Sequence, residues 1–374
     1  MLTRLEICGY RSLERVRLPL SPLTVVTGTN GSGKSNLYRS LALLARGARG
    51  ELARALAEDG GMPSALWSGP RRRMGRGPEP VVFSVAVRGD DYGYEFTCGL
   101  PGKSESKFNR DPEVKAEEAW LGPQRRPSFT ILERNHGSLH ARAADGERVH
   151  YPLALENQET ALSQVIDARR FPDLAGLRSR LASWRFYHHF RCDAESPLRV
   201  PRPSTITTSL AGDGADIAAA LQTIFEHGDS DALHEAVDML HPGARLEIED
   251  VDGLASLEMR LHLPGLLRPL RAREFSDGQL RYLALTAALL CPKPGELLAF
   301  NEPESSLHPD LLPGLATLLV RASRESQIWV TTHSESLAAA LTAVTGESPL
   351  RLTIEKGATR VLGLNGLGER MADE

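Results

Sequence analysis

The run Gly28-Thr29-Asn30-Gly31-Ser32-Gly33-Lys34-Ser35 has the residue types and spacing of a phosphate-binding loop, GxxxxGK followed by Ser or Thr. Glycines let backbone N–H groups close around phosphate oxygens, and the positive end of a following helix adds attraction. The side chain of Lys34 can neutralise β- and γ-phosphate charge, and the Ser35 hydroxyl can ligate Mg²⁺. The residues expected to contact a nucleotide are Asn30, Gly31, Ser32, Gly33, Lys34, Ser35 and Asn36.

Two further stretches place polar side chains directly after buried apolar runs. Asn301 and Glu302 follow "LLAF", and His333 follows "IWVTT", 31 residues beyond Glu302. In an open α/β sheet, ligands bind beyond the carboxyl ends of the strands. A glutamate there can orient or deprotonate an attacking water, and a histidine can contact a γ-phosphate or the water.

A third stretch, Ser276-Asp277-Gly278-Gln279, stands 26 residues before Glu302 and leads at once into an apolar helical run. A serine and a glycine at a helix start suit anion binding. The same pattern is also typical of a helix that is simply well capped, so the residues alone leave both interpretations open.

The elements that must position these residues can be read from hydrophobic periodicity. Residues 22–28 predict a strand, followed by a glycine-rich turn and a helix from Asn36, and residues 4–10 look like a neighbouring strand. From residue 279, helix, buried strand, helix and buried strand alternate, which predicts a parallel sheet with helices on both faces. Between these parts we expect antiparallel strands over 81–151, helix over 158–190 broken near Pro172, two short helices over 213–241, and strands over 244–263.

Composition sets the outer limits. The chain has 374 residues, 41% hydrophobic and 25% charged, with a formal net charge of −4. This is ordinary globular composition, with no general attraction to nucleic acid. No signal peptide, no apolar run long enough to cross a membrane and no CxxC pair is visible, so we expect a cytoplasmic protein with no membrane partner.

Taken together and in this order, the stretches "YRSL", "LTVVTGTNGSGKSNLYRSL", "FSDGQLRYLAL", "LLAFNEPESSLHPDLL" and "VTTHS" resemble ABC-type ATPases of the RecF, SMC and OLD kind. They look most like the small bacterial predicted ATPases with an EPE..LHP element. The resemblance implies an α/β fold: an ABC-type P-loop NTPase head with a mixed central sheet, helices on both faces, an antiparallel β subdomain and a helical signature subdomain. It implies one head, with lobe I about 1–155 plus 290–374 and a helical lobe about 156–289.

The resemblance also implies a mechanism that uses ATP and Mg²⁺. Two heads form a homodimer around two ATP molecules, so that Ser276, Gly278 and Gln279 contact the nucleotide of the partner subunit. Glu302 then activates water, His333 senses the γ-phosphate and Lys34 completes the catalytic set. Weaker expectations from the same resemblance are a nucleotide contact by Arg11, which is also typical of a surface arginine, and a magnesium contact by either Gln158 or Gln164.

Asn301 stands where the family usually has Asp. An asparagine keeps one acceptor oxygen for a water bound to Mg²⁺ but carries no negative charge. We therefore expect an ATPase that binds magnesium more weakly and turns over slowly. Two functions remain open: an ATPase coupled to DNA in repair or anti-phage defence, and an ATP-gated clamp for a separate effector protein, with little turnover and no DNA contact.

Three other clusters carry weaker signals. His188, His189, Cys192 and Asp193 have metal-ligand side chains, although their aromatic context favours packed structural residues. The arginines of two stretches could contact nucleic-acid phosphates or be ordinary solvated side chains; they are Arg71, Arg72, Arg73 and Arg76 in a loop, and Arg169, Arg170, Arg178 and Arg180 in a helical stretch.

Overall fold

The computed structural model describes residues 1–70, 73–74, 77–78, 81–102, 105–135, 137–151, 155–251, 253, 256–366 and 368–369, with the backbone alone for 73–74 and 77–78. The chain forms two compact units. Unit 1 comprises Met1–Ser21, Gly28–Trp184 and Leu350–Glu374, and unit 2 comprises Pro22–Thr27 and Arg185–Pro349. These limits differ from those of the two expected lobes, and the division into lobes stays a prediction.

Unit 1 is built on a sheet of eight strands in which every pair of neighbours is antiparallel. The order is β11 (Arg148–His150), β10 (Ser138–Arg142), β9 (Thr130–Asn135), β8 (Glu113–Leu121), β7 (Tyr92–Gly99), β6 (Val82–Gly89), β1 (Leu2–Tyr10) and β2 (Leu13–Pro19). One face of this sheet is apolar and buried. Leu5 of β1 and Val87 of β6 are opposite each other in the pairing, so their side chains lie on the same face, and both are fully buried. The predicted antiparallel region over 81–151 is confirmed.

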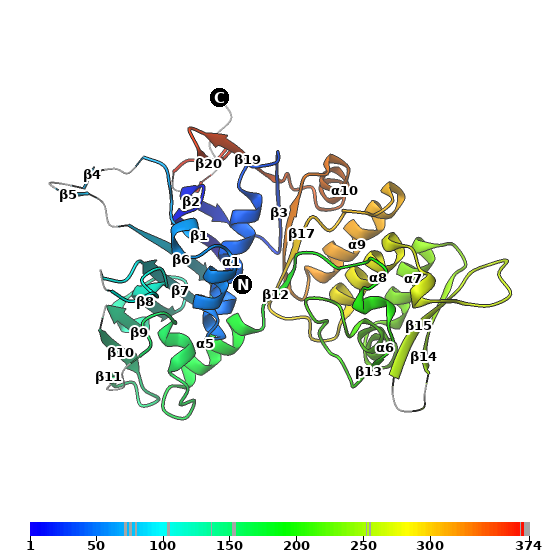
Figure 1. Cartoon of the computed structure of the whole chain (residues 1–374), viewed down its shortest axis with the longest axis horizontal. Coiled ribbons are helices and arrows are strands. Elements are labelled where there is room, and N and C mark those ends of the chain that lie inside the picture. The colour runs from blue at the N-terminus through cyan, green and yellow to red at the C-terminus, as the bar shows by residue number, and fades with distance from the viewer. Residues whose placement is uncertain are drawn as a thin grey trace. The chain divides into compact units, whose positions relative to one another are not determined.

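Five helices of the described chain belong to unit 1, and Figure 1 shows α1 and α5 beside the sheet. They are α1 (Lys34–Ala48), α2 (Leu52–Glu58), α3 (Met62–Ala65), α4 (Ala161–Gln164) and α5 (Pro172–Ala182). Apolar residues of α1 at helical spacing, including Leu37, Leu41 and Leu44, are fully buried. The unit also contains two hairpins, β4 (Arg73–Met74) with β5 (Gly77–Pro78) and β19 (Leu350–Glu355) with β20 (Ala358–Val361), and the 3₁₀ turn η1 (Pro127–Phe129).

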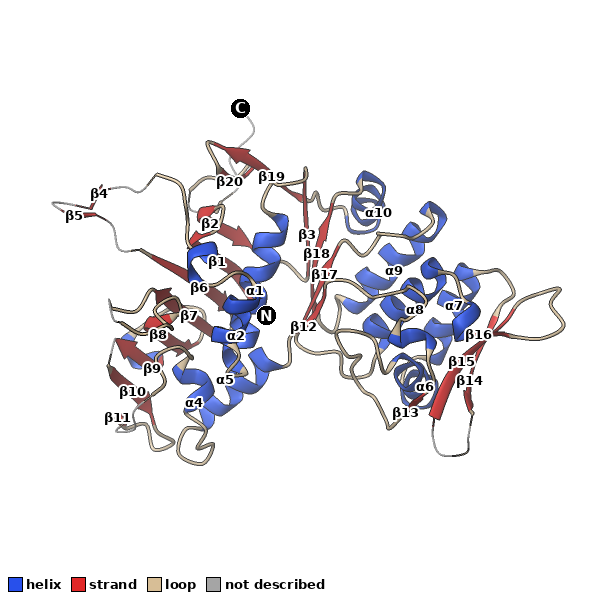
Figure 2. Ribbon diagram, viewed as in Figure 1, coloured by secondary structure: helices blue, strands red, loops and turns tan. Residues whose placement is uncertain are grey.

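Unit 2 contains the four parallel strands β12 (Arg185–Tyr187), β17 (Leu297–Asn301), β18 (Gln327–Thr332) and β3 (Leu23–Gly28), in that order. Every residue of β17 and β18 is buried, as the continuous apolar runs predict. Helices α8 (Asp277–Leu290), α9 (Leu312–Ala322) and α10 (Glu335–Thr345) lie along one side of the strands (Figure 2). β3 ends at Gly28, where the chain passes from unit 2 to unit 1.

The rest of unit 2 is a helical and antiparallel part between β12 and α8. It comprises α6 (Ile217–His227) and α7 (Ser230–Leu240), the strands β13 (Arg202–Pro203), β14 (Arg245–Asp250), β15 (Ser256–His262) and β16 (Leu270–Arg271), and the 3₁₀ turns η2 (Pro197–Arg199) and η3 (Ala272–Glu274); η4 (Pro309–Leu311) leads into α9. Both the predicted pair of short helices and the predicted strands over 244–263 are confirmed. Within the part of the chain that the structure describes, no helix is long and apolar enough to cross a membrane.

Two predictions about neighbouring elements are wrong. Residues 4–10 do not pair with residues 22–28, because β2 lies beside β1 and β3 pairs with β18 in unit 2. The helix expected over 158–190 is shorter than predicted, because residues 185–187 form strand β12. The expected break near Pro172 is present, since Pro172 occupies the first turn of α5, where its missing N–H costs no hydrogen bond. Only the short α4 precedes it in the range that was expected to be helical.

A buried carboxylate joins the sheet of unit 1 to α4. The side chain of Glu117 on β8 is 2% exposed and accepts hydrogen bonds from the Tyr94 hydroxyl at 2.9 Å and from the backbone N–H groups of Ala161 and Leu162 at 2.5 and 2.9 Å. Burial raises the pKa of Glu117, while the hydrogen bonds from Leu162 and Ala161 lower it. Three donors from two elements therefore depend on this one side chain.

We expect Glu117→Ala to destabilise unit 1 by about 2–4 kcal/mol, because it leaves a buried hydroxyl and two buried N–H groups without their acceptor. Glu118→Ala, on the same strand, removes only a surface ion pair with Arg125 and should cost less than about 1 kcal/mol. Denaturant unfolding followed by circular dichroism measures both values. Equal losses in the two variants would contradict the role assigned to Glu117.

Candidate functional site

The phosphate loop folds as its sequence predicts. Helix α1 begins at Lys34, with Gly33 as its N-cap, and no side chain among the described residues caps that end. The Lys34 ammonium donates to the carbonyl oxygens of Gly28 at 2.6 Å and Thr29 at 3.1 Å, so it reaches back across the loop. Ser35 is exposed at the start of the helix. A helix N-terminus, a lysine and an exposed hydroxyl form the donor set that a nucleotide phosphate with Mg²⁺ requires.

Two residues that the sequence does not point to brace this loop. The Thr359 hydroxyl, on β20, donates to the Ser32 carbonyl oxygen at 3.0 Å and lies 2.8 Å from the Ser12 hydroxyl. The Asn36 side-chain amide donates to the same Ser12 hydroxyl at 2.8 Å. Gly33 has φ +103° and a Cβ there would stand 2.1 Å from the Thr359 hydroxyl oxygen, so only glycine fits. Asn36 thus supports the loop from outside.

In unit 2, parallel pairing brings the predicted catalytic strand ends to one edge. β17 and β18 pair with Asn301 opposite Thr331, and β18 pairs with β3 with Thr332 opposite Thr27, the residue before the phosphate loop. The Thr331 hydroxyl donates to the Asn301 side-chain oxygen at 2.7 Å. Asn301 is therefore held by its neighbour in the sheet, with its one acceptor oxygen defined.

Glu302 leaves the strand in an unusual conformation. Its φ is +49°, in the left-handed region that non-glycine residues rarely adopt. Such strain is concentrated at functional sites. Its backbone N–H still donates to the Thr331 carbonyl oxygen at 2.7 Å, and its carboxylate lies 3.3 Å from Nδ1 of His333. The predicted pair of a carboxylate and a histidine is thus brought together within unit 2.

A second glutamate supports this pair. Glu304 is 8% exposed and accepts a hydrogen bond from the Thr332 hydroxyl at 2.5 Å. The backbone N–H of His333 donates to the same carboxylate oxygen at 3.3 Å. The Glu304 carboxylate therefore fixes the turn that carries His333. The sequence motif Glu302-Pro303-Glu304 did not by itself predict this role.

The start of α8 shows how the signature residues are arranged. The Ser276 hydroxyl accepts from the Gln279 N–H at 3.2 Å and the Gln279 side chain accepts from the Ser276 N–H at 2.8 Å, which is a capping box. A Cβ on Gly278 would stand 3.0 Å from the Ser306 carbonyl oxygen, so glycine allows this helix end to pack on the loop after Glu302. Both side chains expected to bind nucleotide in trans also cap their own helix.

Arg281 is a further residue that the sequence patterns did not single out. It follows the signature stretch on α8, and its guanidinium donates to the carbonyl oxygens of Glu302 at 2.9 Å and Pro303 at 3.4 Å. It also lies 3.1 Å from Nδ1 of His189. Burial lowers the pKa of Arg281, although an arginine stays charged throughout the physiological range.

The contacts of Arg11, Gln158 and Gln164 bear on the weaker expectations for nucleotide and magnesium binding. Arg11 is engaged by Asp59, donating to its carbonyl oxygen at 3.0 Å and lying 3.4 Å from its carboxylate. The segment with Gln158 and Gln164 lies against the C-terminal end of α1, because the Thr160 hydroxyl donates to the Gly47 carbonyl oxygen at 2.9 Å. That end is roughly 20 Å along the helix from Lys34. This placement argues against a magnesium contact for either glutamine.

The stretch from His188 to Asp193 differs from the packed segment that was expected, because His188, His189 and Asp193 are exposed and Phe190 alone is buried within it. Within the described part of the chain, no group of three or more His, Cys, Asp or Glu side chains could hold a metal ion. His189 instead meets Arg281, and Asp193 pairs with Arg191 at 2.6 Å. The arginines of the basic loop, Arg71, Arg72 and Arg76 together with the side chain of Arg73, lie outside the described residues.

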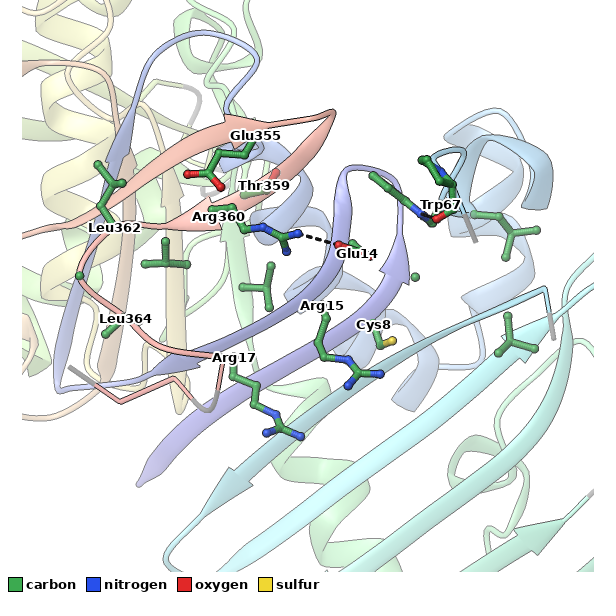
Figure 3. Close-up of a pocket in the computed structure, with 18 of the residues that line it drawn as sticks. Cys8, Glu14, Arg15, Arg17, Trp67, Glu355, Thr359, Arg360, Leu362 and Leu364 are labelled. Carbon is green, nitrogen blue, oxygen red and sulfur yellow. Dashed lines mark hydrogen bonds and ion pairs between the residues drawn. The ribbon is translucent and has the colours of Figure 1, made fainter. Parts of the chain in front are cut away.

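A cavity of about 790 Å³ lies in unit 1 beside the β19–β20 hairpin (Figure 3). Figure 3 shows Arg360 directed at Glu14, with an ion pair of 2.7 Å. Thr359 lines the cavity and also braces the phosphate loop, whereas Lys34 and Ser35 do not line it. The cavity is therefore separate from the phosphate loop and shares one residue with its support.

Comparison with known proteins identifies a family for most of the chain. The family model described as "AAA domain, putative AbiEii toxin, Type IV TA system" matches residues 23–339. A segment of 44 residues, 12% of this chain, is 46% identical to an OLD nuclease of Thermus scotoductus and spans 8% of that relative's length.

Solved structures show the same fold at low sequence identity. An SMC head bound to the C-terminal winged-helix domain of ScpA has a TM-score of 0.59 at 16% identity, over 96% of this chain and 97% of that chain. An SMC head with a coiled coil and joint from Pyrococcus yayanosii has a TM-score of 0.54 at 12% identity, over 97% of both chains. The family match covers most of the chain, and the chain therefore belongs to this AAA-domain family and has the fold of the SMC heads.

Proposed function

We propose that the chain binds ATP with Mg²⁺, hydrolyses it slowly and works as a homodimer that closes on two ATP molecules. The observation that supports this most is the common edge of β17, β18 and β3. At this edge the Glu302 carboxylate lies 3.3 Å from Nδ1 of His333. Strand β3 of the same edge leads into the phosphate loop at Gly28. Positioning of this kind supplies most of the catalysis in phosphoryl transfer, where the protein makes little covalent chemistry.

In the proposed reaction, the Lys34 ammonium and the N-terminus of α1 hold the β- and γ-phosphates. The carboxylate of Glu302 accepts the proton of the attacking water as the water oxygen bonds to the γ-phosphorus and the bond to the leaving ADP oxygen breaks. With its proton on Nδ1, the His333 ring donates to Glu302 and directs Nε2 outward, where it can meet the water or the γ-phosphate. Closure traps two anionic nucleotides between positive helix ends.

The Ser35 hydroxyl of unit 1 and the Asn301 side chain of unit 2 each have a chemistry suited to magnesium, one as a ligand and one as an acceptor for a metal-bound water. Bound Mg²⁺ would neutralise charge on the β- and γ-phosphate oxygens. Asn301 offers one oxygen, already bonded to the Thr331 hydroxyl, and it offers no negative charge to a water of the metal. The missing negative charge at Asn301 and the bond of its oxygen to Thr331 support weak magnesium binding and slow turnover.

For the biological role, we propose that the nucleotide state is coupled to DNA in repair or anti-phage defence. The short match to an OLD nuclease and the family description that mentions a type IV TA system support this assignment. Cytoplasmic location is part of the same proposal. The arginines expected to form a second basic patch are partly engaged, since Arg180 pairs with Asp91 at 3.1 Å and Arg178 donates to the Val165 carbonyl oxygen at 3.4 Å.

A second role, an ATP-gated clamp for a separate effector protein, is favoured by one observation in unit 2. The loop between β15 and β16 exposes two leucines, with Leu266 51% and Leu267 108% exposed. Adjacent exposed leucines are typical of a protein contact surface. The SMC head cited above was solved with a domain of another protein bound to it, so a head of this fold can carry such a partner.

Glu302→Gln should lower ATP turnover by about 100-fold or more while ATP binding is retained, because the amide can accept no proton from water. A phosphate-release assay and nucleotide titration measure the two quantities, with the exposed Glu325→Gln as the matched control. The variant should also elute as a dimer with ATP in sizing chromatography. Wild-type turnover no greater than that of Glu302→Gln would refute the enzyme assignment, and a persistent monomer would count against closure.

Asn301→Asp should lower the Mg²⁺ concentration that gives half-maximal turnover by roughly tenfold, because a carboxylate holds a metal-bound water more strongly than an amide. The Thr331 hydroxyl can donate to the new carboxylate as it does to Asn301. Magnesium titrations of turnover in the two proteins decide the point. An unchanged magnesium dependence would show that Asn301 does not face the metal.

Duplex DNA separates the two roles. If the head is coupled to DNA, turnover should rise severalfold with duplex DNA, and binding should weaken steeply with salt as counterions are released. If it is a protein clamp, DNA should leave turnover unchanged. A partner should then bind Glu302→Gln only with ATP, and Leu267→Asp should remove that binding without affecting turnover.

A further inference from the structure

Arg281 is a buried cation with three polar partners and no direct part in the proposed reaction. Its side chain is 3% exposed, and all the groups that it contacts belong to unit 2. Two of them are consecutive carbonyl oxygens, those of Glu302 and Pro303, and the third is Nδ1 of His189. A guanidinium has donors only, so Nδ1 of His189 must be the acceptor and carry no proton. A buried charge is kept only where such partners satisfy it.

The contact matters because of where the Glu302 backbone stands. With φ at +49°, the residue occupies a conformation that an L side chain does not choose unaided. Its carbonyl oxygen accepts from Arg281 at 2.9 Å and from the Ser305 N–H at 3.2 Å. The charged donor is the stronger of the two. It fixes the peptide plane between Glu302 and Pro303, and that plane sets the direction in which the carboxylate leaves the chain.

Arg281 also belongs to the helix whose start carries the proposed contacts to the partner's nucleotide, α8. It lies five residues after Ser276, in the second turn of this helix. A helix transmits displacement as a rigid element. At the same helix end, Gly278 packs against the carbonyl oxygen of Ser306 in the loop after Glu302. A shift of this first turn therefore reaches the Glu302 peptide directly through Arg281, in addition to the loop that Gly278 contacts.

We propose that Arg281 is a positioning residue for Glu302 and that it transmits nucleotide contact at the start of α8 to the water-activating carboxylate. His189 is the acceptor for the guanidinium nitrogen that does not bond a carbonyl oxygen. This assignment rests on the proposed ATPase function. It also accounts for the stretch around His189, which serves the site through Arg281 and holds no metal.

The geometry requires arginine in particular. The planar guanidinium presents donors in several fixed directions and can reach two carbonyl oxygens and an imidazole at once. A lysine ammonium at the same position keeps the charge but is a single compact point on a flexible stem, so it cannot hold all three acceptors. Arg281→Lys therefore keeps the positive charge at this site but loses the contacts that position Glu302.

Arg281→Lys should lower kcat by ~10- to 100-fold, since a displacement of about 1 Å at a reacting group has an effect of this size. Because the phosphate loop is unaltered, KM should stay within about threefold, and ATP should still drive dimerisation in sizing chromatography. His189→Ala, at an exposed position, should lower kcat less, in the same direction and again without change in KM. Arg185→Lys is the control, because that partly buried arginine of unit 2 contacts Ser209 at 2.9 Å and neither α8 nor Glu302.

The outcomes are separable from failure of the ATPase assignment. If wild type exceeds Glu302→Gln but Arg281→Lys turns over like wild type, the positioning role is refuted. It is equally refuted if kcat and ATP-driven dimerisation fall while KM rises in both Arg281→Lys and Arg185→Lys, because general loosening of the fold then accounts for the loss. Should Arg281→Lys fail to fold, His189→Ala decides: wild-type kcat in that variant overturns the proposal.

Discussion

The in-register parallel pairing of β17, β18 and β3 is the constraint on which the candidate site depends. A slip of one residue in this register would turn Asn301 to the opposite face of the sheet and separate it from Thr331. The hydrogen bond between these two residues and the approach of Glu302 to His333 exist only in the observed register. Every residue of β17 and β18 is buried, so side chains on both faces of these strands are packed in the observed register.

The two helix starts of the site are stabilised in different ways. Helix α8 satisfies its first turn with its own side chains, through the reciprocal bonds of Ser276 and Gln279. Helix α1 has no side-chain cap, and its entry loop is held instead by Lys34 and by the hydroxyl of Thr359. A capped helix end keeps its geometry without a ligand, whereas an uncapped one leaves its positive end for phosphate.

Two buried charged side chains, both within unit 2, hold the turns that carry the reacting groups. Glu304 fixes the backbone at His333, and Arg281 fixes the backbone at Glu302. Each bonds more than one group at once: Arg281 reaches two carbonyl oxygens and an imidazole, and one oxygen of Glu304 accepts from the Thr332 hydroxyl and the His333 N–H. These contacts explain how this chain holds the carboxylate that we propose to be catalytic.

Much of this could be predicted from the sequence because it is local. The phosphate loop, the alternation of buried strands with helices after residue 279 and the antiparallel region over 81–151 follow from spacing and periodicity over short segments. Strand β2 was not predicted, and residues 22–28 were expected beside residues 4–10 in its place, because periodicity does not state which strands are neighbours.

Other features were decided by tertiary structure alone. Ser12 and Thr359 are 347 positions apart, and no local pattern connects either of them to the phosphate loop that they brace. The contacts of Arg281 join three separate segments, and only packing brings its charge against the backbone of Glu302. The sequence by itself determined which chemical groups are present and in what order. The fold decided which of them meet, because hydrogen bonds and close approach depend on distance in space and not along the chain.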